Sequence, residues 1–316
     1  MDLEPNVRAA AAELGFLACG IAGLEASRFG DRLDQWLGQG YAGTMRYLHR
    51  QAAKRKQPAT IVPGARVAVV VLDNYLPPKG SVGVSGSPPV RAVKIAKYAR
   101  GRDYHLDCGD RLARLADTLR DLGATVAQPF VDAGPVPERE LAQRAGLGWL
   151  GKNTMLIRPG VGSFFFIGSV FTDLALRPDQ PFSTEHCGTC TRCLDACPTA
   201  ALPSPGVLDA TRCLSYLTIE HRGEPPEELS RRYDGWAFGC DVCNDVCPWN
   251  LRFAAPTAHP EFGDRGEVDR ADPAYFERLT ESEFDRRFGD TPLERPGLSG
   301  MRRNYRHAFA STEPVP

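Results

Sequence analysis

The chain has 316 residues, of which 42% are hydrophobic and 24% charged, a globular composition long enough for two cores. Its formal net charge of -1 excludes a strong overall attraction to nucleic acid, so any such partner must meet a local basic patch. The N-terminus resembles no export signal, and the longest apolar run, residues 163–171, is far shorter than the roughly 20 residues of a membrane span. We therefore expect a cytoplasmic protein with no membrane partner.

The first half of the chain alternates predicted strands and helices. The runs "ARVAVVVLDNY", "TVAQPFV" and "SFFFIGSVF" are typical of buried strands, and "PERELAQRA" is typical of a helix. Between the first two strands, leucines recur at helical spacing, at Leu106, Leu112, Leu115, Leu119 and Leu122. These elements predict an α/β domain over residues 1–178.

Two basic patterns are candidates for contact with phosphates. Arg91, Lys94, Lys97 and Arg100 repeat every third residue, which would form a basic stripe along a helix. In most proteins such a stripe is solvated surface, but in a protein that binds nucleic acid it is a candidate phosphate track. The second pattern is in "MRRNYRH", with Arg302, Arg303 and Arg306.

Two short motifs resemble known binding signatures without meeting all their requirements. "GLGWLGK" has the G-x-G-x-x-G spacing, but it follows a predicted helix rather than the strand that a dinucleotide fold requires. "DYHLDCG" nearly matches the D-x-H-x-x-G signature of proteins that coordinate cobalamin through a histidine, but Gly109 falls one residue late. His105 is therefore expected to be a polar site or surface residue rather than an axial ligand.

Seven of the ten cysteines form two runs that end in Cys-Pro, and an eighth stands alone between the runs. The first run has the spacing C-x2-C-x2-C-x3-C-P, typical of bacterial ferredoxins, in which the fourth cysteine binds the other of two [4Fe-4S] clusters. By this exchange, one cluster has the ligands Cys187, Cys190, Cys193 and Cys247. The other cluster has the ligands Cys197, Cys213, Cys240 and Cys243.

Two structural zinc sites are the alternative, but they favour paired C-x2-C knuckles over a triple run followed by Cys-Pro. Cys19 and Cys108 lie outside both runs and are expected to be small buried hydrophobic residues or unused thiols. The runs predict a ferredoxin-like module over residues 179–255, behind the Pro-rich linker "LRPDQPFSTEH". Residues 256–316 predict a short helical C-terminal region, and the overall fold class is α+β.

Four stretches together resemble the epoxyqueuosine reductase family: "YARGRDYH", "VDAGPVPERELAQRAGLGWLGKNTMLI", the two cysteine runs and "TPLERPGLSGMRRN". The resemblance covers nearly the whole chain, although many members have longer C-terminal regions. It implies that residues 1–178 bind cobalamin without a histidine beneath the cobalt. It also implies reduction of epoxyqueuosine to queuosine at the wobble position of a tRNA anticodon stem-loop. The sequence does not identify the electron donor, and we expect a monomer.

The resemblance also implies roles for particular residues. Asp132 becomes the proton donor, which requires burial or a neighbouring like charge to keep a carboxylic acid protonated near neutral pH. From the sequence alone, Asp132 is equally well a turn residue before "AGPVP". The positions implied for the cobalamin site are Arg55, His105, Arg139, Lys152, Asn153 and Ser215; for Arg55, within "KRK", solvated surface is the alternative.

Two other functions use the same cysteine runs. A reductive dehalogenase or related cobalamin-dependent reductase acting on a small molecule would share both clusters and the corrin. A ferredoxin-like electron carrier would share only the clusters, and it leaves the large N-terminal domain unexplained.

Overall fold

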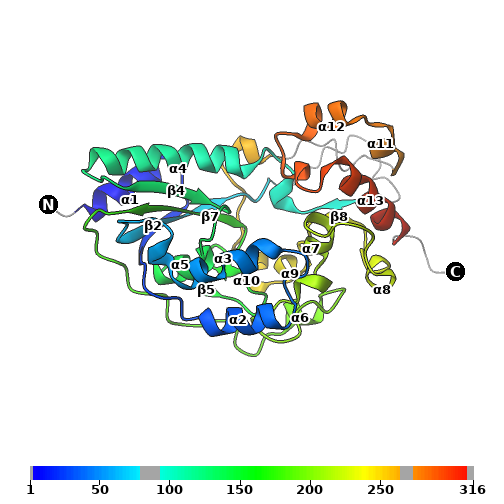
Figure 1. Cartoon of the computed structure of the whole chain (residues 1–316), viewed down its shortest axis with the longest axis horizontal. Coiled ribbons are helices and arrows are strands. Elements are labelled where there is room, and N and C mark those ends of the chain that lie inside the picture. Colours follow the sequence, from blue (N-terminus) through cyan, green and yellow to red (C-terminus); the bar gives the residue numbers. More distant parts are fainter. Residues whose placement is uncertain (1–2, 79–92, 264–272, 312–316) are drawn as a thin grey trace.

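The computed structural model describes residues 3–78, 93–263 and 273–311. Its N-terminal half is built on a four-stranded sheet with the order β1-β2-β7-β4 (Figure 1). All three neighbouring pairs in this sheet are antiparallel, so the mixed helix-and-strand architecture is of the α+β type. The four strands are β1 Ala18–Gly23, β2 Val67–Asn74, β7 Phe165–Thr172 and β4 Ala127–Val131.

Strand β2 shows why both faces of the sheet are covered. Its side chains alternate, so that Val67, Val69 and Val71 belong to one core while Ala68, Val70 and Leu72 belong to another. Figure 1 shows α4 and α1 along one face of the sheet and α5 on the opposite face. The buried leucines of α4 share a core with α1, and α5 contributes to the core on the other face. These helices are α1 Glu4–Glu13, α4 Tyr104–Asp121 and α5 Glu138–Arg144. The strands and helices that hydrophobic spacing predicted for this half are confirmed.

The cysteine-bearing segment follows an extended linker and consists of short elements. Its first run lies around α6, Arg192–Asp195, and its second run lies around α9, Val242–Asp245. The other elements are α7 Leu214–Ile219, α8 Glu227–Ser230, β8 Trp236–Phe238 and α10 Pro248–Phe253. The C-terminal helices are α11 Pro273–Arg278, α12 Glu281–Phe288 and α13 Gly297–Ala310, as the helical pattern predicted.

Packing between these regions is extensive. Strand β3, Lys94–Ile95, pairs in parallel with β8 of the cysteine-bearing segment. Val93 and Ile95 share a core with Phe238 and with Met301 of α13. The boundaries at residues 178 and 255 remain a prediction, and the cores cross them. Among the described residues, no helix combines the length and apolarity needed to cross a membrane.

The predicted basic helix is wrong. Lys94 lies in a strand between the buried residues Val93 and Ile95, and residues 97–99 form a single 3-10 turn. Pairing with β8 explains the difference, because alternation of buried and exposed residues is a strand pattern. Lys94 forms an ion pair with Asp234 at 2.8 Å, and Lys97 with Asp245 at 2.5 Å. Arg91 lies outside the described residues.

The second basic pattern is helical, as expected, but two of its three arginines serve the fold. The Arg303 guanidinium is buried and donates to the carbonyl oxygens of His221, Gly223 and Leu217 at 2.8 to 2.9 Å. Arg302 donates to the carbonyl oxygens of residues 276, 277 and 279. Neither side chain supports the predicted phosphate track.

Candidate active site

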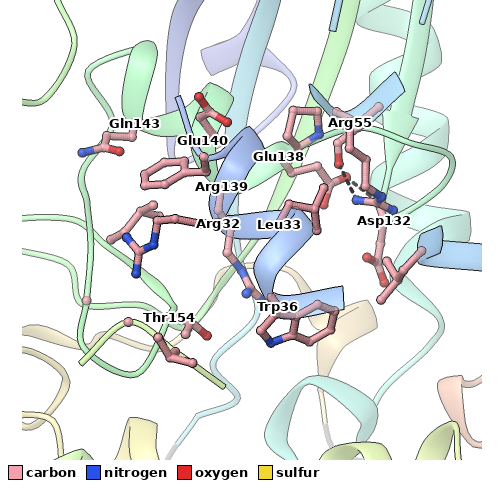
Figure 2. Close-up of a pocket in the computed structure, with 18 of the residues that line it drawn as sticks. Arg32, Leu33, Trp36, Arg55, Asp132, Glu138, Arg139, Glu140, Gln143 and Thr154 are labelled. Carbon is pink, nitrogen blue, oxygen red and sulfur yellow. Dashed lines mark hydrogen bonds between the residues drawn. The ribbon is translucent and has the colours of Figure 1, made fainter. Parts of the chain in front are cut away.

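A cavity of about 1680 Å³ lies between the sheet domain and the cysteine-bearing segment. Its wall combines α2, Gly30–Gly38, and α3, Arg46–Lys56, with the start of α4 and the loop between β4 and α5. Five of the residues predicted for the site line it: Arg55, His105, Asp132, Arg139 and Lys152. Figure 2 shows Arg55, Asp132 and Glu138 on one side of the cavity, and Arg32, Arg139 and Trp36 among its other walls.

Asp132 is the first residue after β4 and is exposed at the cavity. Its φ of 44° lies in the left-handed region, which aspartate tolerates better than most residues. The Tyr104 hydroxyl donates to its Oδ2 at 2.5 Å, and its own backbone N–H donates to Glu138 Oε1 at 2.6 Å. Asp132 is therefore held from both the side chain and the backbone.

Burial, and next the Asp132 carboxylate, raises the pKa of Glu138. Burial and the Asp132 carboxylate also raise the pKa of Tyr104, so the phenol keeps its proton and can donate it in a hydrogen bond. Neither role could be predicted from the sequence, because Tyr104 stands in an incomplete motif and Glu138 stands at the charged start of a helix. Only the folded chain brings both to Asp132.

His105 lies beside this group. Its Nδ1 is 2.8 Å from Asp103 Oδ1, and its ring stacks on Tyr104 with the ring centroids 4.3 Å apart. The hydrogen bond to Asp103 raises the pKa of the His105 imidazole. His105 is an exposed polar residue of the cavity wall.

Arg55 reaches across the cavity wall to the loop that carries Asp132. Its Nη1 donates to the Val136 carbonyl oxygen at 3.2 Å, and its Nη2 donates to that of Gly134 at 3.1 Å. Burial lowers the pKa of this guanidinium. The Arg55 side chain is half-buried, so its position does not support the alternative that it belongs to the solvated surface.

The remaining predicted residues lie against the cysteine segment. Lys152 Nζ donates to the carbonyl oxygens of Gly188 and Cys190, at 2.6 and 3.0 Å. Asn153 is buried outside the cavity wall, with its Nδ2 3.4 Å from the Cys243 carbonyl oxygen. Ser215 also lies outside the wall, close to Cys213: burial raises the pKa of the Cys213 thiol, and the Ser215 side chain partly offsets this.

The cysteine thiols fall into two neighbourhoods. The pKa of Cys193 is raised by burial and then by Cys187, with a further contribution from Cys247. Burial raises the pKa of Cys243 to about 12, and Cys213 is the thiol that adds most to this shift, with Cys197 adding less. Cys213 and Cys243 likewise raise the pKa of Cys240, after burial. Cys193 also adds to the shift of Cys243, so the two neighbourhoods adjoin.

Each neighbourhood brings together thiols that one [4Fe-4S] cluster would need close in space, since its four thiolates bind four irons of one cubane. Among the described side chains, no group of three His, Cys, Asp or Glu residues is arranged to hold a single metal ion. Backbone N–H groups also reach the sulfurs, as in the 3.2 Å contact from Ala201 N to Cys197 Sγ, and such hydrogen bonds tune cluster potentials.

The two cysteines outside the runs lie in or against the sheet core. Cys108 is fully buried and Cys19 is packed against the same core. Burial raises the pKa of both thiols, to about 12 for Cys19. Both positions agree with the small buried residues that their isolation in the sequence predicted.

Two family models match the chain. Residues 55–133 match the model described as "Epoxyqueuosine reductase QueG, DUF1730", and residues 186–250 match the "4Fe-4S double cluster binding domain". The second match covers both cysteine runs and supports two [4Fe-4S] clusters rather than zinc. A ferredoxin-like carrier does not describe the chain, because the first match lies outside this module.

Full-length relatives and solved structures agree with these matches. The chain is 41% identical to an epoxyqueuosine reductase of Xanthomonas campestris pv. campestris, over 96% of this chain and 85% of the relative. It is 42% identical to one of Pseudomonas aeruginosa, over 92% and 81%.

Among solved structures, it matches a crystal structure of epoxyqueuosine reductase with a tRNA-Tyr epoxyqueuosine-modified stem loop, with a TM-score of 0.88 and 28% identity. This match covers 98% of this chain and 81% of that one. A Bacillus subtilis epoxyqueuosine reductase, whose catalytic aspartate loop is swung out of the active site, matches with a TM-score of 0.87, 28% identity and the same coverage. The chain therefore belongs to the epoxyqueuosine reductase family.

Proposed function

We propose that this protein reduces the epoxide of epoxyqueuosine to queuosine at the wobble position of a tRNA anticodon stem-loop. The observation that carries the proposal is the placement of Asp132, bound by Tyr104, in the wall of a large cavity beside two cysteine neighbourhoods. Family membership favours this reaction over dehalogenation of a small molecule. A relative solved with a modified tRNA stem loop supports the same class of substrate.

The cavity fits cobalamin. Its volume of about 1680 Å³ exceeds the roughly 300–1,000 Å³ of pockets for drug-sized ligands, and it mixes polar and apolar walls. Two buried donors of its lining residues, Arg55 Nε and Trp149 Nε1, have no hydrogen-bond partner among the described residues. Arg55, His105, Arg139 and Lys152 would hold the cofactor from the cavity wall, with Asn153 and Ser215 behind it. When bound, cobalamin supplies the strongly reducing metal for the epoxide.

Asp132 supplies the first proton to the epoxide oxygen in this proposal, and solvent supplies the second. Converting an epoxide to an alkene takes up two electrons and two protons, and the oxygen leaves as water. The oxygen leaves far more easily once it is protonated, and the Asp132 carboxyl is the acid that Tyr104 holds at the cavity. Tyr104 and the backbone contact of Glu138 fix the direction of this acid.

We propose the exchanged ligand sets for the two clusters. The set of Cys187, Cys190, Cys193 and Cys247 is supported by the influence of Cys187 and Cys247 on the pKa of Cys193. The set of Cys197, Cys213, Cys240 and Cys243 is supported by the mutual influence of its thiols.

Replacement of Cys247 by Ser tests the exchange. We expect the cluster of the first run to be lost although Cys247 follows the second run in sequence, because its thiol lies with Cys187 and Cys193. Iron analysis and EPR spectra of the reduced protein can identify the remaining cluster. Selective loss of the other cluster, held by Cys240 and Cys243, would show that each run serves its own cluster.

Binding of the stem-loop is expected to weaken as salt rises, because neutralised phosphates release counterions. Arg32 lines the cavity from α2 and is exposed, so it is a candidate phosphate contact. Replacing Arg32 by Ala should reduce the slope of log affinity against log salt by roughly 0.7. Replacing Lys94, which is paired with Asp234, by Ala is the control and should leave the slope unchanged. An equal change in both variants would contradict the assignment of Arg32.

The function can be tested in cells. We expect the wild-type gene to restore queuosine in the tRNA of a bacterial strain that lacks its own epoxyqueuosine reductase. Nucleosides from digested tRNA would be separated and identified by mass spectrometry. Persistence of epoxyqueuosine despite soluble, cluster-loaded protein would contradict the proposal.

A further inference from the structure

The loop that carries Asp132 is fastened at two points by side chains outside it. It runs over residues 132–137, from the end of β4 to the start of α5. Glu138 Oε1 accepts the N–H of Asp132 at 2.6 Å, at the first position beyond the paired part of β4. Arg55 donates to the carbonyl oxygens of Gly134 and Val136 in the middle of the loop. Glu138 thus accepts a hydrogen bond from the loop backbone, and Arg55 donates hydrogen bonds to it.

The backbone of Asp132 needs such support. Even for aspartate, a backbone in the left-handed region is less stable than ordinary backbone, and it persists where the surroundings enforce it. At φ 44°, the Asp132 N–H points to the Glu138 carboxyl and its own carboxyl meets the Tyr104 hydroxyl. Loss of the Glu138 contact would leave the N–H without this acceptor and release the backbone to a negative φ.

We propose that Glu138 and Arg55 are positioning residues that form a clamp on the Asp132 loop and so set the direction of the Asp132 carboxyl. This inference rests on the proposed function for the importance of that carboxyl, but the clamp itself follows from the contacts. Glu138 acts through the backbone N–H of Asp132, and Arg55 acts through the carbonyl oxygens of the loop. Neither contact requires either residue to touch the substrate.

A double-mutant cycle separates positioning from general destabilisation. In the holoenzyme, Glu138→Ala is expected to lower kcat by about 10- to 100-fold, since a misplacement of about 1 Å can cost that much. In a protein that already carries Asp132→Asn, Glu138→Ala should change kcat by less than about threefold, because the group it positions no longer donates a proton. Glu138→Gln should retain most activity, since an amide oxygen can also accept the N–H.

Asp173→Ala is the matched control. The Asp173 carboxylate accepts the N–H groups of Thr125 and Val126, both at 3.0 Å, at the other end of β4. This variant loses the same kind of contact to the same strand, but far along the strand from the cavity. It should lower stability without lowering kcat per folded enzyme.

Amide hydrogen exchange gives a readout that does not depend on turnover. The peptide over residues 131–137 should exchange about tenfold faster in Glu138→Ala, and faster in Arg55→Lys, while the Asp173→Ala protein should match wild type there. Arg55→Lys keeps the charge but loses the two-pronged donor geometry, so it also serves if Glu138→Ala does not fold.

Two results would overturn the clamp. One is unchanged exchange of this peptide in the folded variants, and the other is an equal loss of kcat from Glu138→Ala with and without Asp132→Asn. A wild-type rate for Asp132→Asn alone would instead refute the acid role of Asp132, and the exchange data would still decide whether the clamp exists.

Discussion

Replacing Asp132 by Asn is expected to lower turnover of epoxyqueuosine-containing tRNA by about 10²- to 10⁴-fold, the usual effect of losing a general acid. Asparagine has nearly the same shape and can still accept the Tyr104 hydroxyl, but it has no proton to donate to the leaving oxygen. The loss should appear in kcat under conditions where chemistry limits the rate. The measurement is single-turnover conversion of a modified stem-loop, followed by nucleoside analysis.

Binding provides the control for this variant. Iron content, cobalamin content and stem-loop affinity should match the wild type, because Asp132 is an exposed residue at the end of β4 rather than part of the core. Residual activity is compatible with the proposal, since water can replace an acid in part. A wild-type rate in this variant would mean that Asp132 serves only as a turn or pocket residue.

Replacing Cys243 by Ser is expected to abolish turnover. Cys243 lies near Cys213 and is a ligand in the same proposed set, so its loss should remove one [4Fe-4S] cluster and interrupt the supply of electrons to the cavity. Iron in anaerobically purified protein should fall from about eight to about four atoms per chain.

Cys19 offers a matched control for that experiment. It is half-buried against the sheet core, outside both cysteine runs, and its replacement by Ser should leave iron content unchanged. Stoichiometric zinc with little iron in reconstituted wild-type protein would contradict the cluster assignment for both runs.

Much of the fold could be predicted because local patterns and tertiary packing agree. The apolar run of β2 is buried on both faces of the sheet, and the leucines of α4 face the sheet at helical spacing. The spacing of the cysteines was equally informative, since thiols that share a cluster must be close in space. In each case, the residues that form the sequence pattern are also the residues that make the structural contacts.

The basic stripe shows where this agreement ends. Charge spacing alone suggested a helix, whereas Val93 and Ile95 are buried on either side of Lys94 in a strand. The partner strand β8 and the carboxylates of Asp234 and Asp245 lie about 140 residues further along the chain. No local pattern reveals such partners.

The residues around Asp132 could not be predicted from the sequence for a similar reason. Arg55 stands in a basic run, and only the fold takes its guanidinium to the carbonyl oxygens of Gly134 and Val136. The resemblance to the family assigned Asn153 and Ser215 to the cobalamin site, but the structure places both beside cysteines rather than in the cavity wall. The resemblance to the family identified the relevant segments of the chain, but the contacts of each side chain could be found only from the structure.

The central claim is tested most directly by one reaction with purified protein. Wild-type protein carrying both clusters and cobalamin would be mixed anaerobically with a strong reductant and an epoxyqueuosine-modified stem-loop, and the digested nucleosides would be analysed by mass spectrometry. The account predicts loss of one oxygen atom from the modified nucleoside, with queuosine formed in equal amount to the epoxyqueuosine consumed. Unchanged epoxyqueuosine, with the stem-loop bound and both clusters reduced, would contradict it.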